Sequence, residues 1–180
     1  MKHFGGEKME TEKLTVGKAL KFARHDFLNE LQLMLLYMDL EDTPNARRTL
    51  LEATERMRHI SMLEKLHMPK TEVWLSTFEW NHTVFSKKIK CNIVAGNRVA
   101  EDYAVADYLE QLICAIEKVV DPLEEYIVHI DVGATQDEWS IQLTIEGPLS
   151  EIPLKSQTVE GFQVSKICKD EQWTFTLSGQ

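Results

Sequence analysis

The chain has 180 residues and a formal net charge of −9, from 20 lysines and arginines against 29 aspartates and glutamates. A chain of this length can bury a sizeable core, and its acidity argues against a broad nucleic-acid surface. Hydrophobic residues make up 43% of the chain, with only 8 glycines and 5 prolines, which is the composition of an ordinary folded protein. We therefore expect a globular protein that binds no nucleic acid.

The first predicted element is a helix from about Leu14 to Leu40, a stretch without proline. Thr43 is suited to cap a second helix, and Pro44 to its first position, where the missing N–H costs nothing. This second helix runs to Pro69, and two long helices joined by a short turn form an antiparallel hairpin. Apolar residues recur at helical spacing in both helices: Leu20, Phe27, Leu31, Met34 and Met38 in the first, and Ala46, Leu50, Ala53, Met57, Ile60 and Leu63 in the second.

The hairpin carries more apolar residues than two facing stripes need. The residues off the main seam include Leu28, Leu35, Leu51 and Leu66. A homodimer in which two hairpins form a four-helix bundle would cover them, since twofold pairing is the commonest closed oligomer. The alternative is that these residues pack against the rest of the same chain.

After the hairpin the elements become shorter. A short apolar stretch covers residues 73–78, and a helical stretch is predicted over 80–87. A strand is predicted over 89–95 and a longer helix over 102–120. The apolar face of that helix consists of Tyr108, Leu109, Leu112, Ile113, Ile116 and Val119.

Three later segments, 126–132, 141–145 and 173–177, alternate apolar and polar residues, which predicts strands with one buried and one wet face. The expected fold class is α+β: the hairpin is followed by an α/β sandwich with helices on one side of a largely antiparallel sheet. We divide the chain into a flexible tail (1–13), a helical hairpin for dimerisation (14–68) and an α/β domain (71–180).

The cysteines and the N-terminal residues bear on location. Cys91, Cys114 and Cys168 are far apart and outside any CxxC pattern, so neither a disulfide framework nor a zinc knuckle is predicted, and a reducing compartment fits. The first residues lack the apolar segment of a secretion signal. The longest apolar run, 33–38, is far shorter than the roughly 18 residues of a membrane span. We expect a cytoplasmic protein without membrane contact.

His25 projects from a polar face of the first helix. At about 100° per residue, the centre of the apolar stripe lies on the opposite side. The residues within about 40° of His25 are cationic or amide-bearing, which suits an incoming phosphoryl group: Lys18, Lys21, Asn29 and Gln32. Apolar residues on the side away from the stripe complete a predicted docking surface: Phe22, Leu33 and Leu36.

The motif Arg24-His25-Asp26-Phe27, with Asn29 and Leu31-Gln32, resembles the phosphoacceptor helix of the sporulation initiation phosphotransferase B family. It also resembles the related H-box of citrate-type and quorum-type sensor histidine kinases. The layout agrees, because that family has a helical hairpin followed by a degenerate kinase-type α/β domain. The resemblance implies that His25 is the phosphoacceptor.

Phosphorylation of His25 needs no strong base nearby. A neutral imidazole has a nitrogen lone pair that can attack phosphorus, and the phosphorylated ring carries close to two negative charges, so the site should stay exposed. The resemblance implies that Asp26 orients or polarises the imidazole. Asn29 can hydrogen-bond the ring or the phosphoryl oxygens. Three cations can offset charge in the transition state: Lys18, Lys21 and Arg24.

The α/β domain lacks the marks of nucleotide binding. Residues 109–118 resemble the N-box helix of sensor kinases, but Cys114 stands where an asparagine would hold Mg²⁺, and a thiol is a poor ligand for that ion. Residues 146–149 replace a glycine-rich box and keep only Gly147. No metal site is predicted either, since the other histidines show no ligand spacing with one another: His59, His67, His82 and His129.

Without ATP, His25 must receive its phosphoryl group from another protein. The resemblance implies a phosphorelay: a single-domain response regulator donates from its aspartyl phosphate, and a second, DNA-binding regulator that starts sporulation accepts. The Mg²⁺ needed would sit in the regulator, and this chain would bind no cofactor. Two alternatives stay open, a sensor kinase fragment that still uses ATP and a non-catalytic dimeric scaffold that binds a regulator.

Overall fold

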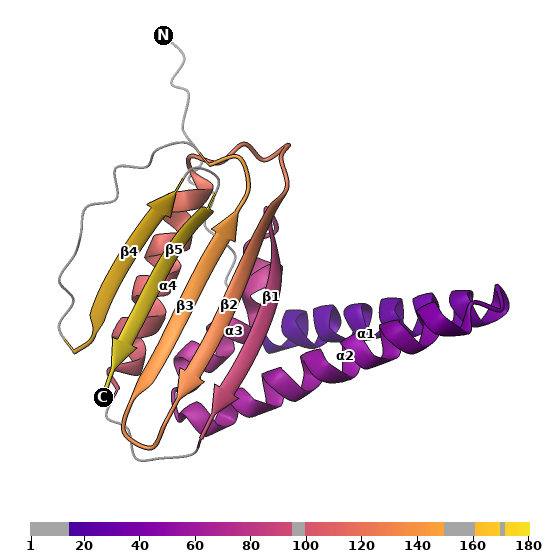
Figure 1. Cartoon of the computed structure of the whole chain (residues 1–180), viewed down its shortest axis with the longest axis horizontal. Coiled ribbons are helices and arrows are strands. Elements are labelled where there is room, and N and C mark those ends of the chain that lie inside the picture. Colours follow the sequence, from indigo (N-terminus) through magenta and orange to yellow (C-terminus); the bar gives the residue numbers. More distant parts are fainter. Residues whose placement is uncertain (1–14, 95–99, 150–160, 170–171) are drawn as a thin grey trace, which may run out of the picture.

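The computed structural model describes residues 15–94, 100–149, 161–169 and 172–180. A two-helix hairpin projects from one side of a five-stranded sheet (Figure 1). The predicted tail, the helix start at residue 14 and the strand end at residue 95 lie outside the described residues. Among the described helices, none is long and apolar enough to cross a membrane.

Helices α1 (Val16–Asp39) and α2 (Thr43–Met62) form the predicted hairpin. The cap of α2 differs from the prediction: Asp42, not Thr43, accepts the backbone N–H of Asn45, at 3.2 Å. A carboxylate at this position also offsets the positive end of the helix dipole.

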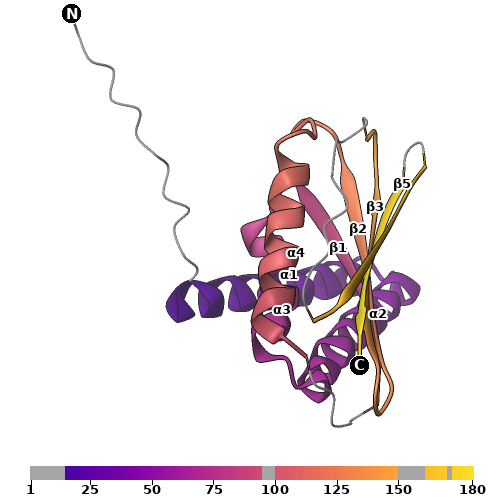
Figure 2. The ribbon, with the colours of Figure 1, turned by 90° about the vertical axis from the view of Figure 1, so that its left-hand side faces the viewer.

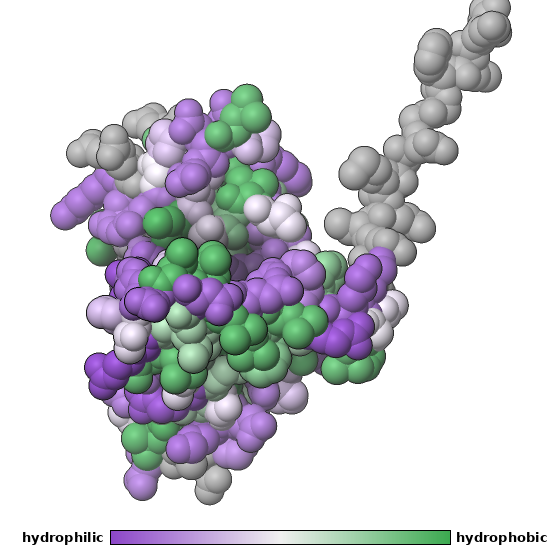
Figure 3. All heavy atoms as spheres, turned by 90° about the vertical axis from the view of Figure 1, so that its right-hand side faces the viewer, coloured by the Kyte–Doolittle hydropathy of each residue, from purple (hydrophilic) through white to green (hydrophobic). Residues whose placement is uncertain are grey.

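The hairpin seam is narrow and leaves one side of α1 uncovered. Arg56 of α2 pairs with Glu30 of α1, and Ala53 is the one buried residue of α2, while α1 has none. Figure 3, in which the hairpin points toward the viewer, shows hydrophobic side chains gathered on it. The apolar residues of α1 that remain 39–64% exposed are Leu20, Phe27, Leu28, Leu31, Leu33, Leu35, Leu36 and Met38.

The end of the hairpin enters the core of the α/β part. Helix α2 stops at Met62 and the chain tightens into the short 3₁₀ helix η1 (Leu63–Leu66). Leu63, Leu66 and Met68 are almost fully buried. Leu66 was one of the residues that either a second copy or the rest of the same chain could cover. Its side chain is buried within its own chain.

The predicted helix over 80–87 is wrong. Helix α3 spans Pro69–Asn81, and strand β1 (Phe85–Ile93) begins four residues later. Pro69, predicted to end the second helix, lies in the first turn of α3, where its ring fits the helix. Alternate residues of β1 face the core, which a helix could not achieve.

The sheet confirms the predicted α/β sandwich. Its further strands are β2 (Tyr126–Ala134), β3 (Trp139–Glu146), β4 (Gln163–Lys169) and β5 (Gln172–Gly179). The order is β1-β2-β3-β5-β4, with β1 and β2 parallel and every other neighbouring pair antiparallel. The edge strand β4 was not predicted, since its residues are mostly exposed and lack an alternating pattern of burial.

Helices α3 and α4 (Asp102–Glu117) cover one face of the sheet (Figure 2). Of the predicted apolar face of α4, Tyr108 is half-buried, Val119 lies beyond the helix end and is 44% exposed, and the other four residues are buried. The carboxylate of Asp102 accepts the backbone N–H groups of Lys70 and Thr71 at 2.8 and 2.9 Å. The first residue of α4 thus caps α3 and fixes the two helices to each other.

Gly147, the remaining glycine of the degenerate box, has a structural reason to be glycine. Its φ is 151°, and a Cβ there would overlap the ring of Tyr126. We expect Gly147→Ala to lower the free energy of unfolding by about 2–4 kcal/mol, measured by urea denaturation. Gly17→Ala, in α1 with open space around it, is the control and should stay within about 1 kcal/mol of the parent. Equal midpoints for the two variants would contradict this account.

Candidate functional site

His25 lies on the exposed side of α1, with 70% of its side chain accessible. The other polar residues of its face are exposed as well, apart from Lys18, which is half-buried. Leu33 and Leu36 are 42% and 52% exposed. The side chains predicted to receive a partner are therefore in place on the surface of the helix.

The imidazole of His25 is held through one nitrogen. Its Nδ1 accepts the side-chain N–H of Asn29, one turn further on, at 3.1 Å. The same Nδ1 lies 3.5 Å from Oδ1 of Asp26. Within the described part of the chain, Nε2 has no hydrogen-bond partner. The ring therefore presents Nε2 to solvent, where it is nucleophilic in the tautomer that carries the proton on Nδ1.

Asp26 has a second partner that sequence reasoning missed. Its Oδ2 accepts the indole N–H of Trp80, from α3, at 2.9 Å. The Trp80 ring stacks on Phe22, with centroids 5.7 Å apart and planes at 29°. Phe22, predicted to dock a partner, thus contacts the α/β part of its own chain. Nothing in the local pattern around residue 80 signals this contact, which joins segments far apart in sequence.

A charged cluster fills the space between α3 and α4. His82, just after α3, is buried and donates from Nδ1 to Glu117 at 3.1 Å and from Nε2 to Glu110 at 3.2 Å. Burial disfavours the imidazolium, but the two carboxylates outweigh that effect and raise the pKa of His82 to about 9. The hydrogen bond from His82 lowers the pKa of Glu110 to about 2; partial burial opposes the shift, and the N–H of Trp74 adds to it.

Cys114, at the degenerate N-box position, belongs to this cluster. Its thiol donates to Oε1 of Glu110 at 3.5 Å, and burial together with Glu110 raises its pKa to about 11, so it stays protonated at neutral pH. Donor atoms of His82, Cys114 and Glu117 lie within 4.8 Å of one another, a grouping that could hold a metal. In the absence of an ion, the buried imidazolium supplies positive charge between the carboxylates.

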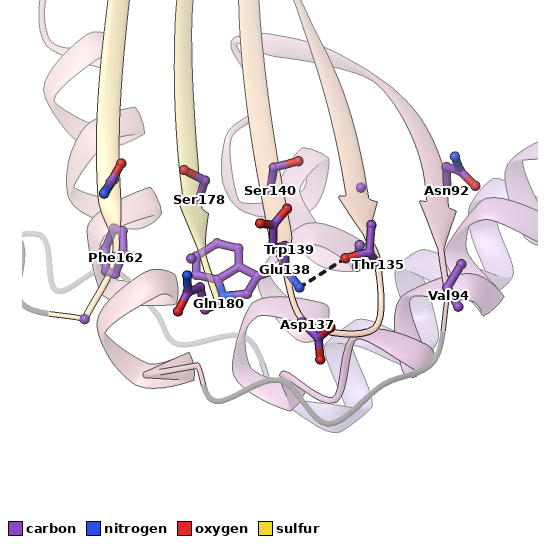
Figure 4. A pocket seen from close by; sticks show the side chains of 15 residues that line it. Asn92, Val94, Thr135, Asp137, Glu138, Trp139, Ser140, Phe162, Ser178 and Gln180 are labelled. Carbon is purple, nitrogen blue, oxygen red and sulfur yellow. Dashed lines mark hydrogen bonds between the residues drawn. The ribbon is translucent and has the colours of Figure 1, made fainter.

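A pocket opens at the end of the sheet where β3 begins and β5 ends (Figure 4). Trp139 is buried on its wall, while Asp137 and Glu138 lie at the β2–β3 turn. Of the described residues that line it, none is lysine or arginine. A nucleoside triphosphate in this pocket would lie near two carboxylates, and no lysine or arginine among these lining residues would offset its charge.

Comparison with known proteins identifies the hairpin. Residues 7–66 match the family model described as the alpha-helical domain of SpoOB-type sensor kinases. This confirms the resemblance first noticed around His25, over the segment that contains α1, α2 and η1. The match is confined to residues 7–66 and is a likeness of the hairpin to that helical domain. None of the curated proteins matches the chain.

Several solved histidine kinases share a distant likeness. The nucleotide-free catalytic domain of ThkA is 9% identical, with 63% of this chain and 92% of that chain covered at a TM-score of 0.45. AdeS of Acinetobacter baumannii is 12% identical over 87% of this chain and 97% of its own, also at 0.45. ThkA in complex with the response regulator TrrA is 12% identical over 91% and 61%, at 0.44. Likeness at this level says nothing of function.

The His82 cluster makes stability depend on pH. Because the folded pKa of His82 lies above its usual value near 6.5, its contribution is complete below about pH 6.5 and is lost as pH rises through about 9. We expect His82→Gln to cost about 2–3 kcal/mol at pH 6 and clearly less at pH 10, measured by urea denaturation at both pH values.

The matched control is His67→Asn, at an exposed position with φ of 58° that asparagine tolerates. This variant should show the same small difference from the parent at both pH values. A cost of His82→Gln that does not change between pH 6 and pH 10 would disprove the charged state of the cluster.

Proposed function

We propose, from the premise that the hairpin is a SpoOB-type helical domain, that this chain is a phosphorelay histidine phosphotransferase. His25 would accept a phosphoryl group from the aspartate of a single-domain response regulator. It would then pass the group to the aspartate of a second, DNA-binding regulator that controls sporulation initiation. The observation that carries the proposal is the exposed imidazole whose Nδ1 is engaged and whose Nε2 is open.

The transfer step follows from this geometry. In the tautomer with the proton on Nδ1, the lone pair of Nε2 forms a bond to phosphorus while the P–O bond to the donor aspartate breaks, and that bond's electron pair stays on the donor carboxylate. Asn29 and Asp26 keep the ring edge-on to solvent, and Lys21 and Arg24 offer positive charge close to the incoming group. The Mg²⁺ that aspartyl phosphate chemistry requires would be held by the regulator, with no cofactor in this chain.

The docking surface is proposed to surround His25. Lys18, Lys21 and Gln32 provide polar contacts, while Leu33 and Leu36 provide exposed apolar area on the same side of α1. A response regulator that inserts an acidic pocket over His25 would meet both kinds of contact.

We also propose that two copies pair through the uncovered side of α1. About 100° per residue places Phe27, Leu31 and Met38 opposite His25, and all three are exposed. A second hairpin would bury them in a four-helix bundle and leave both His25 side chains in water. The protein would work in the cytoplasm, where its partners are.

Independence of ATP is supported by the α/β part. Cys114 is engaged with Glu110, and Gly147 is explained by the ring of Tyr126, so neither residue is left to serve a nucleotide. The sensor kinase alternative predicts phosphate on His25 from ATP alone. The scaffold alternative predicts binding of a regulator without any transfer.

The first test uses a single-domain response regulator phosphorylated with acetyl phosphate and Mg²⁺. Incubation with this chain should yield acid-labile, alkali-stable phosphate on the parent and none on His25→Ala, scored after gel separation. His67→Asn, at an exposed histidine, should keep the label. Equal labelling of His25→Ala would refute the proposed acceptor.

The same assay with radiolabelled ATP and Mg²⁺ in place of the regulator separates the alternatives. We expect no label and no shift in melting temperature. Label from ATP would indicate a sensor kinase fragment. Regulator binding without transfer would indicate a scaffold.

The two faces of α1 can be tested against each other. Leu36→Asp should weaken regulator binding by roughly tenfold and leave the dimer intact, because Leu36 lies on the His25 face. Phe27→Asp should convert the dimer to monomer, because Phe27 lies on the opposite face. Light scattering and a binding titration measure the two effects. A monomeric Leu36→Asp variant would mean that the faces are wrongly assigned.

A further inference from the structure

The carboxylate of Asp26 connects the two parts of the molecule at the candidate site. Oδ2 accepts the indole N–H of Trp80 at 2.9 Å, and Oδ1 lies 3.5 Å from Nδ1 of His25. Trp80 is the second-last residue of α3, 54 positions further along the chain than Asp26. The α/β part therefore reaches the phosphotransfer site through one indole ring.

The indole is itself fixed at two points. Its ring stacks on Phe22, and its N–H pairs with Asp26, one turn further along α1. An indole N–H can only donate, so this orientation requires an acceptor at that point on the helix. A carboxylate is the stronger choice, since a hydrogen bond to a charged acceptor is worth more than one to a neutral group.

We propose that Trp80 is a positioning residue for phosphotransfer: by holding Oδ2 of Asp26 it directs Oδ1 toward the imidazole of His25. The proposal rests on the proposed function of His25. More than half of the Asp26 side chain is exposed, so without the indole it can turn to other χ1 rotamers. Its Oδ1 would then leave the imidazole.

The position of Oδ1 matters because Asn29 and Asp26 favour different states of the ring. The Asn29 amide donates to Nδ1, which requires a bare nitrogen there. Asp26 can only accept, so it favours the tautomer with the proton on Nδ1. That tautomer leaves the lone pair on Nε2, where phosphorus is attacked. As the N–P bond forms the ring becomes cationic, and the nearby carboxylate stabilises this charge.

The test compares Trp80→Phe with Trp74→Phe. Both variants remove an indole N–H that donates to a carboxylate, but the Trp74 N–H donates to Glu110 and not to Asp26. Phosphoramidate, which phosphorylates imidazole directly with loss of ammonia, serves as the donor, so no partner is needed. We expect Trp80→Phe to slow labelling of His25 about tenfold and Trp74→Phe to change it less than twofold.

A double-mutant cycle separates positioning from a general loss of structure. Asp26→Asn should slow labelling, and adding Trp80→Phe to it should slow labelling no further, since Trp80 acts through Asp26. Replacement of Trp80 by benzothienylalanine, which keeps the shape of indole without its N–H, should reproduce Trp80→Phe if that variant folds poorly. Additive effects in the cycle would overturn the proposal.

A readout independent of activity is the tautomer of His25, measured from ¹⁵N chemical shifts. The parent should hold more of the Nδ1–H tautomer than Trp80→Phe, and equal populations would overturn the proposal. The two proposals fail differently. Failure of the parent to take phosphate from any donor defeats the proposed function, whereas equal labelling of the parent and Trp80→Phe defeats only the role of Trp80.

Discussion

If His25 carries a phosphoryl group as proposed, it has to remain in water, and the exposed hairpin meets that constraint. Burying the doubly charged product without partners would cost several kcal/mol, so the helix that presents it cannot be enclosed. Helix α1 has no buried residue along its 24 positions. It is instead held at its sides, by α2 along the seam and by Trp80 at one point. The exposed apolar side that results is the one on which we propose a second copy packs.

The α/β part provides the rigidity that the hairpin lacks. Its core is closed by α3 and α4 on one face of the sheet, and these helices are joined by the Asp102 cap at one end and the His82 cluster at the other. On α4, Cys114 and Glu110 contact each other.

Local periodicity was enough to predict much of the fold. The stripes of α1 and α4 and the alternation in β2, β3 and β5 follow directly from spacing. Helix α4 and the three strands each place one face in the core, whereas α1 has no buried residue. The prediction for 80–87 is wrong because Pro69 begins α3, so that the helix ends at Asn81 and residues 85–87 already belong to β1. Trp80 and His82 escaped prediction for a different reason: their partners are 28 to 54 residues away, and no pattern within one element encodes such contacts.

The hydrogen bond between Trp80 of α3 and Asp26 of α1 also bears on the order of folding. A helical hairpin is built from local contacts and can form early, whereas the parallel pair β1–β2 joins strands separated by α4 and has to wait for distant segments to meet. Trp80 reaches Asp26 only when α3 is seated on that sheet. If Trp80 has the role proposed for it, a newly made chain would display His25 before it could use it well, and completion of the sheet would set the moment at which the histidine becomes competent.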